Sequence, residues 1–243
     1  GKSSIILRFL DRNDIPKPTI ALEYTYGRRT TATVKDIGNI WEIGGGSSLI
    51  NLIEIPITSS TIGVTSIVII IDLTKPEDIW KIYKNILLYI KDYVHSLLET
   101  IKKDLPEKYN QLISINKNKF KNHQDVNAVN PFPIPLAIIA TKYDEFQKMD
   151  PEIRKNVCKF LRFLAHMNGA SLQMFSNKME NTVLKVRALI SHLLFGTTPS
   201  KTIVTDYDKP ISIPTSMDSL EVRFQYFLYF LLSIPLAAGS TNY

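Results

Sequence analysis

The hydrophobic positions of the chain form short β-branched runs that alternate with stretches of helical spacing. Two runs, residues 65–73 and 136–141, are almost continuously apolar. Such runs are typical of parallel strands that are buried on both faces. Between them, residues 77–103 carry apolar side chains at intervals of three and four, which predicts the longest helix. We therefore expect residues 65–73 to form a central strand of a sheet that is covered by helices.

The other elements continue this alternation. Helices are predicted at 2–12, 49–55, 151–168 and 178–195, and extended segments at 20–26, 30–43, 170–175 and 202–205. Residues 104–130 are rich in Lys and Asn without clear periodicity, so we expect an exposed loop. The alternating order predicts an α/β fold with a doubly wound, mostly parallel sheet.

The pattern weakens after Gly196, so we expect a domain over residues 1–196 and a C-terminal extension, with partner contacts, over 197–243. Residues 224–238 are strongly apolar but contain Gln225 and Pro235. This stretch is shorter than the ~20 residues that a membrane-spanning helix needs, so we expect no transmembrane span. A packing helix or a partner contact is the favoured interpretation.

The composition excludes several classes of protein. The 243 residues include 29 Lys and Arg against 23 Asp and Glu, a net charge of +6. These basic residues are spread along the chain, so we expect no nucleic-acid partner. One cysteine, Cys158, excludes a disulfide framework or a cysteine-pair zinc site and favours a reducing compartment. The four histidines show no ligand spacing and are expected to be structural or at the surface: His95, His123, His166 and His192.

Phosphate chemistry is suggested at the start of the chain. Gly1-Lys2-Ser3-Ser4, at the head of a helix, matches the second half of a P-loop, G-x-x-x-x-G-K-[ST]. In that motif the lysine reaches the terminal phosphates and the next hydroxyl binds Mg²⁺. The first glycine and the strand before it are not in the sequence, so we expect residues upstream of Gly1 in the native protein. A relic loop that only starts a helix is an equally good interpretation.

Further segments follow in the order of a GTPase. Thr19 stands where a switch I threonine binds Mg²⁺, and Glu42-Ile43-Gly44-Gly45 stands where D-x-x-G lies. Thr141-Lys142-Tyr143-Asp144 follows a buried strand, as the base-reading N-K-x-D motif does. Together with Ser176-Asn177-Lys178 in the place of S-A-K, these segments predict a Ras-like P-loop GTPase fold. The predicted ligand is GTP or GDP with Mg²⁺, with these binding residues: Gly1, Lys2, Ser3, Ser4, Thr19, Gly45, Lys142, Asp144, Ser176 and Lys178, of which Ser3 and Thr19 hold the metal.

Three residues depart from the GTPase pattern, and two of them, Glu42 and Gly46, argue against hydrolysis. Glu42 replaces the usual Asp, and its extra methylene shifts the carboxylate. Gly46 stands where GTPases have a water-orienting Gln, and a glycine cannot orient water. Thr141 replaces the Asn that shapes the base pocket, whereas Asp144 keeps the carboxylate that accepts from guanine. We therefore predict no enzymatic activity, and we expect either a bound, unhydrolysed nucleotide or no cofactor.

The sequence also resembles the light intermediate chain of cytoplasmic dynein 2 over roughly residues 1–220. The resemblance is carried by PKPTIALEYTYGRR (16–29), WEIGGG (41–46), IPIT (55–58), DLTKPEDIW (72–80), PFPIPLAIIATKYDEFQ (131–147) and LRFLAHMNGASL (161–172). It implies a non-catalytic scaffold on the dynein 2 heavy-chain tail, which contacts other dynein 2 subunits and intraflagellar transport trains indirectly. It also implies a place in the cytoplasm and the cilium, at the axoneme and basal body, in retrograde intraflagellar transport.

Two alternatives stay open: an active small GTPase switch, and the light intermediate chain of dynein 1. The segment EYTYGRR argues against dynein 1. Candidate contacts for the heavy chain are the helix at 77–103, residues 19–29 and the tail after Gly196. For Tyr24, Tyr26 and Trp41, core packing is favoured over partner contact. For residues 44–46, a tight backbone passage is favoured over a mobile switch.

Overall fold

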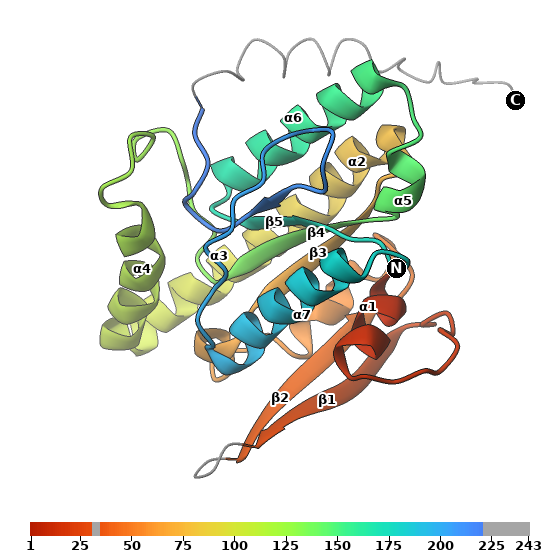
Figure 1. Cartoon of the computed structure of the whole chain (residues 1–243). Coiled ribbons are helices and arrows are strands. Elements are labelled where there is room, and N and C mark those ends of the chain that lie inside the picture. Colours follow the sequence, from red (N-terminus) through yellow and green to blue (C-terminus); the bar gives the residue numbers. More distant parts are fainter. Residues whose placement is uncertain (31–34, 221–243) are drawn as a thin grey trace, which may run out of the picture.

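The computed structural model describes residues 1–30 and 35–220, which form a four-stranded sheet with helices on both faces and a separate two-stranded hairpin (Figure 1). The larger sheet has the order β3-β4-β5-β6, with parallel pairing except at β6. Its strands are β3 Ile67–Asp72, β4 Leu136–Thr141, β5 Ser171–Met174 and β6 Ser212–Ile213. The predicted α/β fold with a mostly parallel sheet is confirmed.

Helices cover the two faces of this sheet. One face packs against α1 (Lys2–Phe9) and α7 (Glu180–Phe195). The other face packs against α2 (Pro76–Ile82), α3 (Leu88–Asp104) and α6 (Pro151–Met167), and α4 (Pro106–Phe120) lies against α3. The short α5 (Tyr143–Phe146) follows β4.

Strand β4 is the centre of the hydrophobic core, and all six of its residues are buried. Ile138 and Ala140 face the larger apolar cluster, whereas Ile139 packs with Ile5 and Val183 on the opposite face. This alternation follows from the two-residue period of a strand. Complete burial stabilises each such isoleucine by about 1.5–3 kcal/mol, so β4 anchors both helical layers.

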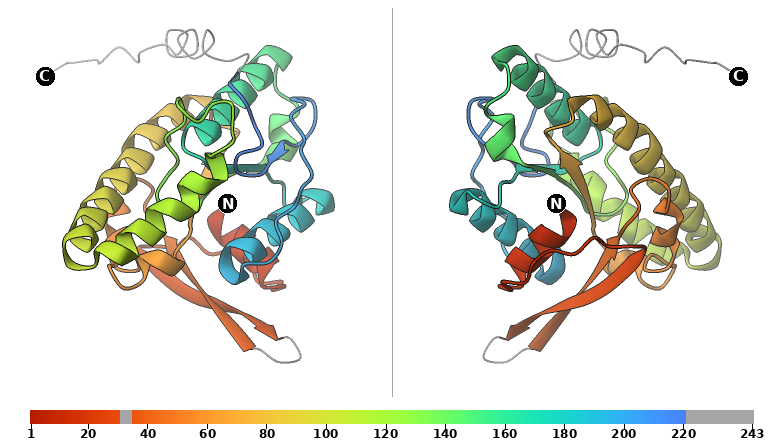
Figure 2. Two further views of the ribbon diagram at one scale, coloured as in Figure 1. Left: turned by 90° about the vertical axis from the view of Figure 1, so that its left-hand side faces the viewer. Right: turned by 90° about the vertical axis from the view of Figure 1, so that its right-hand side faces the viewer.

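The hairpin of β1 (Leu22–Thr30) and β2 (Lys35–Ile43) projects from the rest of the fold (Figure 2). Gly27 and Gly38 pair directly and lie against the helical layer. A Cβ atom at Gly38 would lie 3.1 Å from side-chain atoms of Leu194 and Phe195, and one at Gly27 would lie 3.2 Å from Phe9. The two glycines therefore let the hairpin approach α1 and α7 closely.

The other face of the hairpin carries Tyr24, Tyr26 and Trp41, which are 52%, 40% and 43% exposed. Tyr24 pairs with Trp41 across the strands, with ring centroids 4.9 Å apart. Core packing, the favoured expectation for these aromatic residues, is therefore wrong. Alternation along the strand places them on the face opposite Gly27 and Gly38.

Most predicted elements are confirmed. Helices 2–12, 151–168 and 178–195 correspond to α1, α6 and α7. The predicted helix 77–103 is present as α2 and α3, joined by a π-helical turn at Tyr83–Leu87. Residues 49–55 contain a 3₁₀ helix, Ile50–Glu54. Asp150 caps α6 by accepting hydrogen bonds from two backbone N–H groups, and Gly196 ends α7 in the left-handed region.

Two predictions about the secondary-structure elements are wrong. Residues 104–130 are not a loop throughout, because α4 occupies much of this stretch and buries Leu112 and Phe120. The predicted central strand lies at the end of the four-stranded sheet, paired within the described residues to β4 alone. Its Val68 is 38% exposed, so the strand is not buried on both faces.

Residues 197–220 follow α7 and add β6 to the edge of the sheet. Val204 forms an isolated bridge with Ser212, where a strand at 202–205 is predicted, and Ile211 and Ile213 join the core. Residues 221–243, including the apolar stretch 224–238, lie outside the described residues, so their predicted role stays a prediction, as do the domain boundaries. In the part of the chain that the structure describes, no helix combines the length and hydrophobicity needed to cross a membrane.

Candidate nucleotide site at the carboxyl ends of the strands

The predicted phosphate-binding residues meet where α1 begins. A Cβ atom at Gly1 would lie 3.3 Å from Thr141 Oγ1, so α1 begins at the carboxyl end of β4. Lys2, Ser3 and Ser4 occupy the first turn of α1 and are partly buried. The Ser3 hydroxyl donates a 2.8 Å hydrogen bond to Glu42 Oε1. The fold thus joins Ser3, a predicted Mg²⁺ ligand, to Glu42, the residue in the place of the motif's aspartate.

The Thr19 backbone lies against Gly44, two residues after Glu42. A Cβ atom at Gly44 would lie 2.1 Å from the carbonyl oxygen of Thr19, so the two backbones touch. Thr19 Oγ1 is buried and lacks a hydrogen-bond partner among the described residues. A buried hydroxyl without a partner is unfavourable. Two hydroxyls and the Glu42 carboxylate are oxygen ligands of the kind that Mg²⁺ prefers, so these residues fit a magnesium–phosphate group.

The glycines after β2 form a tight backbone passage, as predicted. Gly44 has no room for a side chain against Thr19. Gly45 and Gly46 have φ values of +69° and +58°, in the left-handed region that favours glycine. No described atom lies within 4 Å of a Cβ built on Gly46, so this position is open.

The predicted base-binding residues lie after β4 and β5. Lys142 adopts a left-handed conformation, with φ +61°, and its Nζ lies 2.6 Å from Asp72 Oδ2. Burial alone would raise the pKa of Asp72, but hydrogen bonds from Lys142 and Thr74 outweigh it and lower that pKa. Asp72 is the last residue of β3, so this ion pair links neighbouring strand ends.

Asp144 is held by two residues that follow β5. Ser176 Oγ donates to Asp144 Oδ1 at 2.7 Å, and Lys178 Nζ lies 2.8 Å from Asp144 Oδ2. The hydrogen bonds from Lys178 and Ser176 lower the pKa of Asp144, and the same contact raises the pKa of Lys178. Ser176 is fully buried, and its N–H donates to Thr182 Oγ1. The Asp144 carboxylate is therefore oriented and ionised at neutral pH.

Comparison with known proteins gives a consistent result. No family model matches the chain. The chain is 48% identical to cytoplasmic dynein 2 light intermediate chain 1 of Mus musculus, 47% to that of Homo sapiens and 43% to that of Danio rerio, in each case over 90% of its length. The chain is a homologue of the cytoplasmic dynein 2 light intermediate chains. It spans 62–63% of the length of these relatives.

The fold agrees with that of a dynein light intermediate chain. A crystal structure of the dynein light intermediate chain's conserved domain aligns with a TM-score of 0.59 at 19% identity, over 90% of this chain and 78% of the other. The predicted fold class, α/β with a mostly parallel sheet, is thereby confirmed. The nucleotide-binding role of individual residues in this light intermediate chain homologue stays a prediction.

The sequence motifs did not predict two contacts of the site. Thr141, which replaces the asparagine of the motif, ties β4 to β3, because its Oγ1 donates to the Ile71 carbonyl oxygen at 3.0 Å. Asp72 is the partner of Lys142, although no motif marked it. The only available signal was its position at the end of a predicted parallel strand, because such ends gather at one edge of a sheet.

Proposed function

We propose that this chain is a non-catalytic subunit of the cytoplasmic dynein 2 motor, a scaffold that binds the heavy-chain tail in the cytoplasm and cilium and supports retrograde intraflagellar transport. One observation carries the proposal: 43–48% identity over 90% of the chain to proteins named cytoplasmic dynein 2 light intermediate chain 1. Other dynein 2 subunits and intraflagellar transport trains would be indirect partners. The dynein 2 names of these relatives favour this proposal over a dynein 1 subunit.

The outer face of the β1–β2 hairpin is the surface that we propose for the heavy chain. Tyr24, Tyr26 and Trp41 form one continuous row of aromatic contacts there. Arg28 extends the row, because its guanidinium lies 5.0 Å from the centroid of the Tyr26 ring. Exposed aromatic and arginine side chains are enriched where proteins bind one another. This surface overlaps residues 19–29, which the sequence already suggested.

The proposed role needs no hydrolysis. Gly46 offers no side chain to orient a water molecule, and Glu42 is engaged by Ser3. If GTP or GDP binds, Ser3 and Thr19 would hold Mg²⁺, while Lys2 and Gly45 would lie at the phosphates and Asp144 at the base. Bound nucleotide would supply phosphate charge and an Mg²⁺ ion. Its role here is structural, joining α1, the Thr19 segment and the strand ends.

Co-purification tests the proposal directly. The chain is co-expressed with the tail of the dynein 2 heavy chain and, separately, with that of the dynein 1 heavy chain. We expect a stable complex with the dynein 2 tail that survives size-exclusion chromatography. Recovery with the dynein 1 tail alone would favour the dynein 1 alternative. Binding to neither tail would overturn the scaffold role, and steady GTP turnover would overturn its non-catalytic character.

A further inference from the structure

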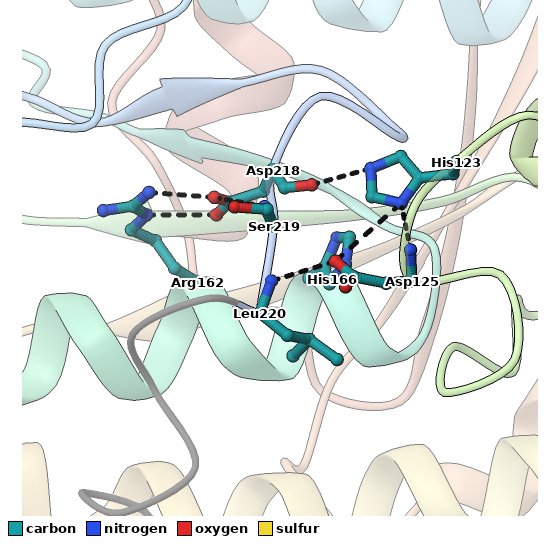
Figure 3. Close-up of polar contacts among 7 residues, drawn as sticks. All are labelled: His123, Asp125, Arg162, His166, Asp218, Ser219 and Leu220. Carbon is teal, nitrogen blue, oxygen red and sulfur yellow. Dashed lines mark hydrogen bonds and ion pairs between the residues drawn. The ribbon is translucent and has the colours of Figure 1, made fainter.

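Two imidazoles and one carboxylate lie close together at His123, Asp125 and His166 (Figure 3). His123 and Asp125 lie in the segment that follows α4, and His166 lies in the last turn of α6. Each offers one ligand atom, and these atoms all lie within 4.8 Å of one another. The fold joins residues that are well separated in sequence, which is why the histidine spacing gave no signal.

The separations suit a small metal ion. His166 Nε2 lies 2.9 Å from Asp125 Oδ2, and His123 Nδ1 lies 3.8 Å from the same oxygen. In a tetrahedral zinc site, with bonds of about 2.0–2.2 Å, neighbouring ligand atoms lie about 3.4 Å apart. These two distances bracket that value, and the third pair of ligand atoms lies within 4.8 Å, so side-chain adjustments would bring all three atoms to one ion.

The orientation of His123 is that of a metal ligand. Its Nε2 lies 2.9 Å from the carbonyl oxygen of Asp218, which can only accept a hydrogen bond. Nε2 therefore carries the proton, and Nδ1 presents its lone pair toward Asp125. A histidine that donates one ring N–H to a carbonyl while its other nitrogen faces the metal is the usual arrangement around bound zinc. The ion would displace a 3.1 Å hydrogen bond from Asp125 N–H to Nδ1.

The other two ligands are also held by their surroundings. Leu220 N–H donates to Asp125 Oδ2 at 2.9 Å and orients the carboxylate. The His166 side chain is 1% exposed, and its Nε2 donates to Asp125 Oδ2, so a bound ion would take the place of this proton and the ring would carry its proton at Nδ1. Phe120 packs against both imidazoles, with ring centroids 5.6 Å from His123 and 6.2 Å from His166. These contacts restrain the ligand side chains before an ion arrives.

The neighbouring charges are compensated. Arg162 makes two hydrogen bonds with the carboxylate of Asp218, which also accepts from Ser219 N–H (Figure 3). The positive guanidinium is therefore neutralised by Asp218 and leaves Asp125 to balance the ion. A small cavity lined by His166, Arg162, Ser216 and Asp218 adjoins the group.

We propose that His123 Nδ1, Asp125 Oδ2 and His166 Nε2 bind one Zn²⁺ ion, with water in the fourth position. Two imidazoles and a carboxylate favour zinc over Mg²⁺ or Ca²⁺, which prefer ligand sets made of oxygen. The ion would fasten the segment after α4 to α6 and, through the hydrogen bonds of His123 and Asp125, to residues 218–220. Its role is structural and independent of nucleotide or heavy-chain binding.

Metal titration of the full chain tests the site. The protein is prepared without a histidine tag, treated with a chelator and titrated with Zn²⁺ by calorimetry and with Co²⁺ by visible spectroscopy. We expect one ion per chain, the visible absorption of four-coordinate Co²⁺ and a higher unfolding midpoint that a chelator reverses. His123→Gln and Asp125→Asn should each weaken Zn²⁺ binding by at least about tenfold. His95→Gln, at an exposed position of α3, is the matched control and should bind like the parent.

Several results would overturn the site. One is a saturated zinc content far below one per chain. Another is parental affinity in either folded ligand variant, which would leave the three residues as a hydrogen-bonded network only. Circular dichroism checks the fold of each variant. If both variants fail to fold, the Co²⁺ spectrum of the unmodified chain decides, because a spectrum typical of six-coordinate Co²⁺ would contradict the tetrahedral site.

Discussion

The Ser3 hydroxyl donates a 2.8 Å hydrogen bond to Glu42 Oε1 and so joins the first turn of α1 to β2. In P-loop proteins this serine position binds Mg²⁺. The longer side chain of Glu42, compared with an aspartate, reaches the serine directly. Thr19 Oγ1 is buried without a partner among the described residues, and if magnesium binds, Ser3 and Thr19 are the hydroxyls that would hold it.

We therefore predict that the chain purifies with guanine nucleotide, and that Ser3→Ala lowers the nucleotide content by at least about tenfold, the scale of losing one ligand-supporting group. The physical reason is the loss of one oxygen ligand at the metal. Released small molecules are measured by ion-exchange chromatography after denaturation. Ser114→Ala, at an exposed position of α4, should change nothing. An empty parent protein would make the P-loop a relic while leaving the dynein 2 proposal intact.

Gly44 and Gly46 should respond differently to an added methyl group. A Cβ atom at Gly44 would lie 2.1 Å from the Thr19 carbonyl oxygen, a backbone atom that cannot rotate away. We expect Gly44→Ala to lower the free energy of unfolding by about 3 kcal/mol, the upper end for overpacking. Gly46→Ala meets open space and should cost about 1–2 kcal/mol through its positive φ. Urea unfolding measures both, and equal losses would contradict the tight passage at Gly44.

The regular elements were predictable because their patterns are strong. The buried run of β4 and the capped helix α6 combine local propensity with tertiary burial, so sequence and fold agree. Helix α4 was missed because Lys and Asn dilute its apolar positions, although Leu112 and Phe120 are buried. Tyr24, Tyr26 and Trp41 were misplaced because a strand pattern does not reveal which of its two faces is covered.

The residues of the candidate sites also differ in whether the sequence could predict them. Motif positions such as Ser3 and Glu42 were predictable because spacing in a known loop fixes their neighbourhood. The group of His123, Asp125 and His166 was not, because only the fold brings the segment after α4 next to the last turn of α6. The Lys142–Asp72 ion pair was hidden for the same reason, since it depends on strand register.

Acid should weaken the fold through Asp144. Its pKa is lowered by Lys178 and Ser176, so the unfolded chain binds a proton at a higher pH than the folded chain does. The stability from this contact is fully present above the ordinary aspartate pKa of about 3.9 and is lost as the pH falls through the lowered value. We expect Asp144→Asn to reduce the difference in unfolding free energy between roughly pH 6 and roughly pH 3, two measuring points on either side of the ordinary aspartate pKa.

Urea unfolding at each pH measures this effect, with Asn177→Ala as a control at an exposed, uncharged position in the same loop. Lys178→Gln should act like Asp144→Asn, because it removes the main cause of the lowered Asp144 pKa. An acid dependence identical in the parent and both variants would show that the Asp144–Lys178 contact does not contribute to folding.

The aromatic row on the β1–β2 hairpin gives the sharpest test of the proposed heavy-chain contact. Trp41 packs on Tyr24 yet is 43% exposed, so Trp41→Ala removes contact area while leaving the core intact. We expect binding to the dynein 2 heavy-chain tail to weaken by about 2 kcal/mol or more, roughly thirtyfold, as at interface hot spots.

Val64→Ala, at an apolar position that is 89% exposed, is the matched control and should bind like the parent. Surface plasmon resonance gives the affinities, and thermal unfolding confirms that both variants are folded. Parental affinity in a folded Trp41→Ala variant would move the contact away from this hairpin, because a buried aromatic anchor cannot be removed from an interface without loss.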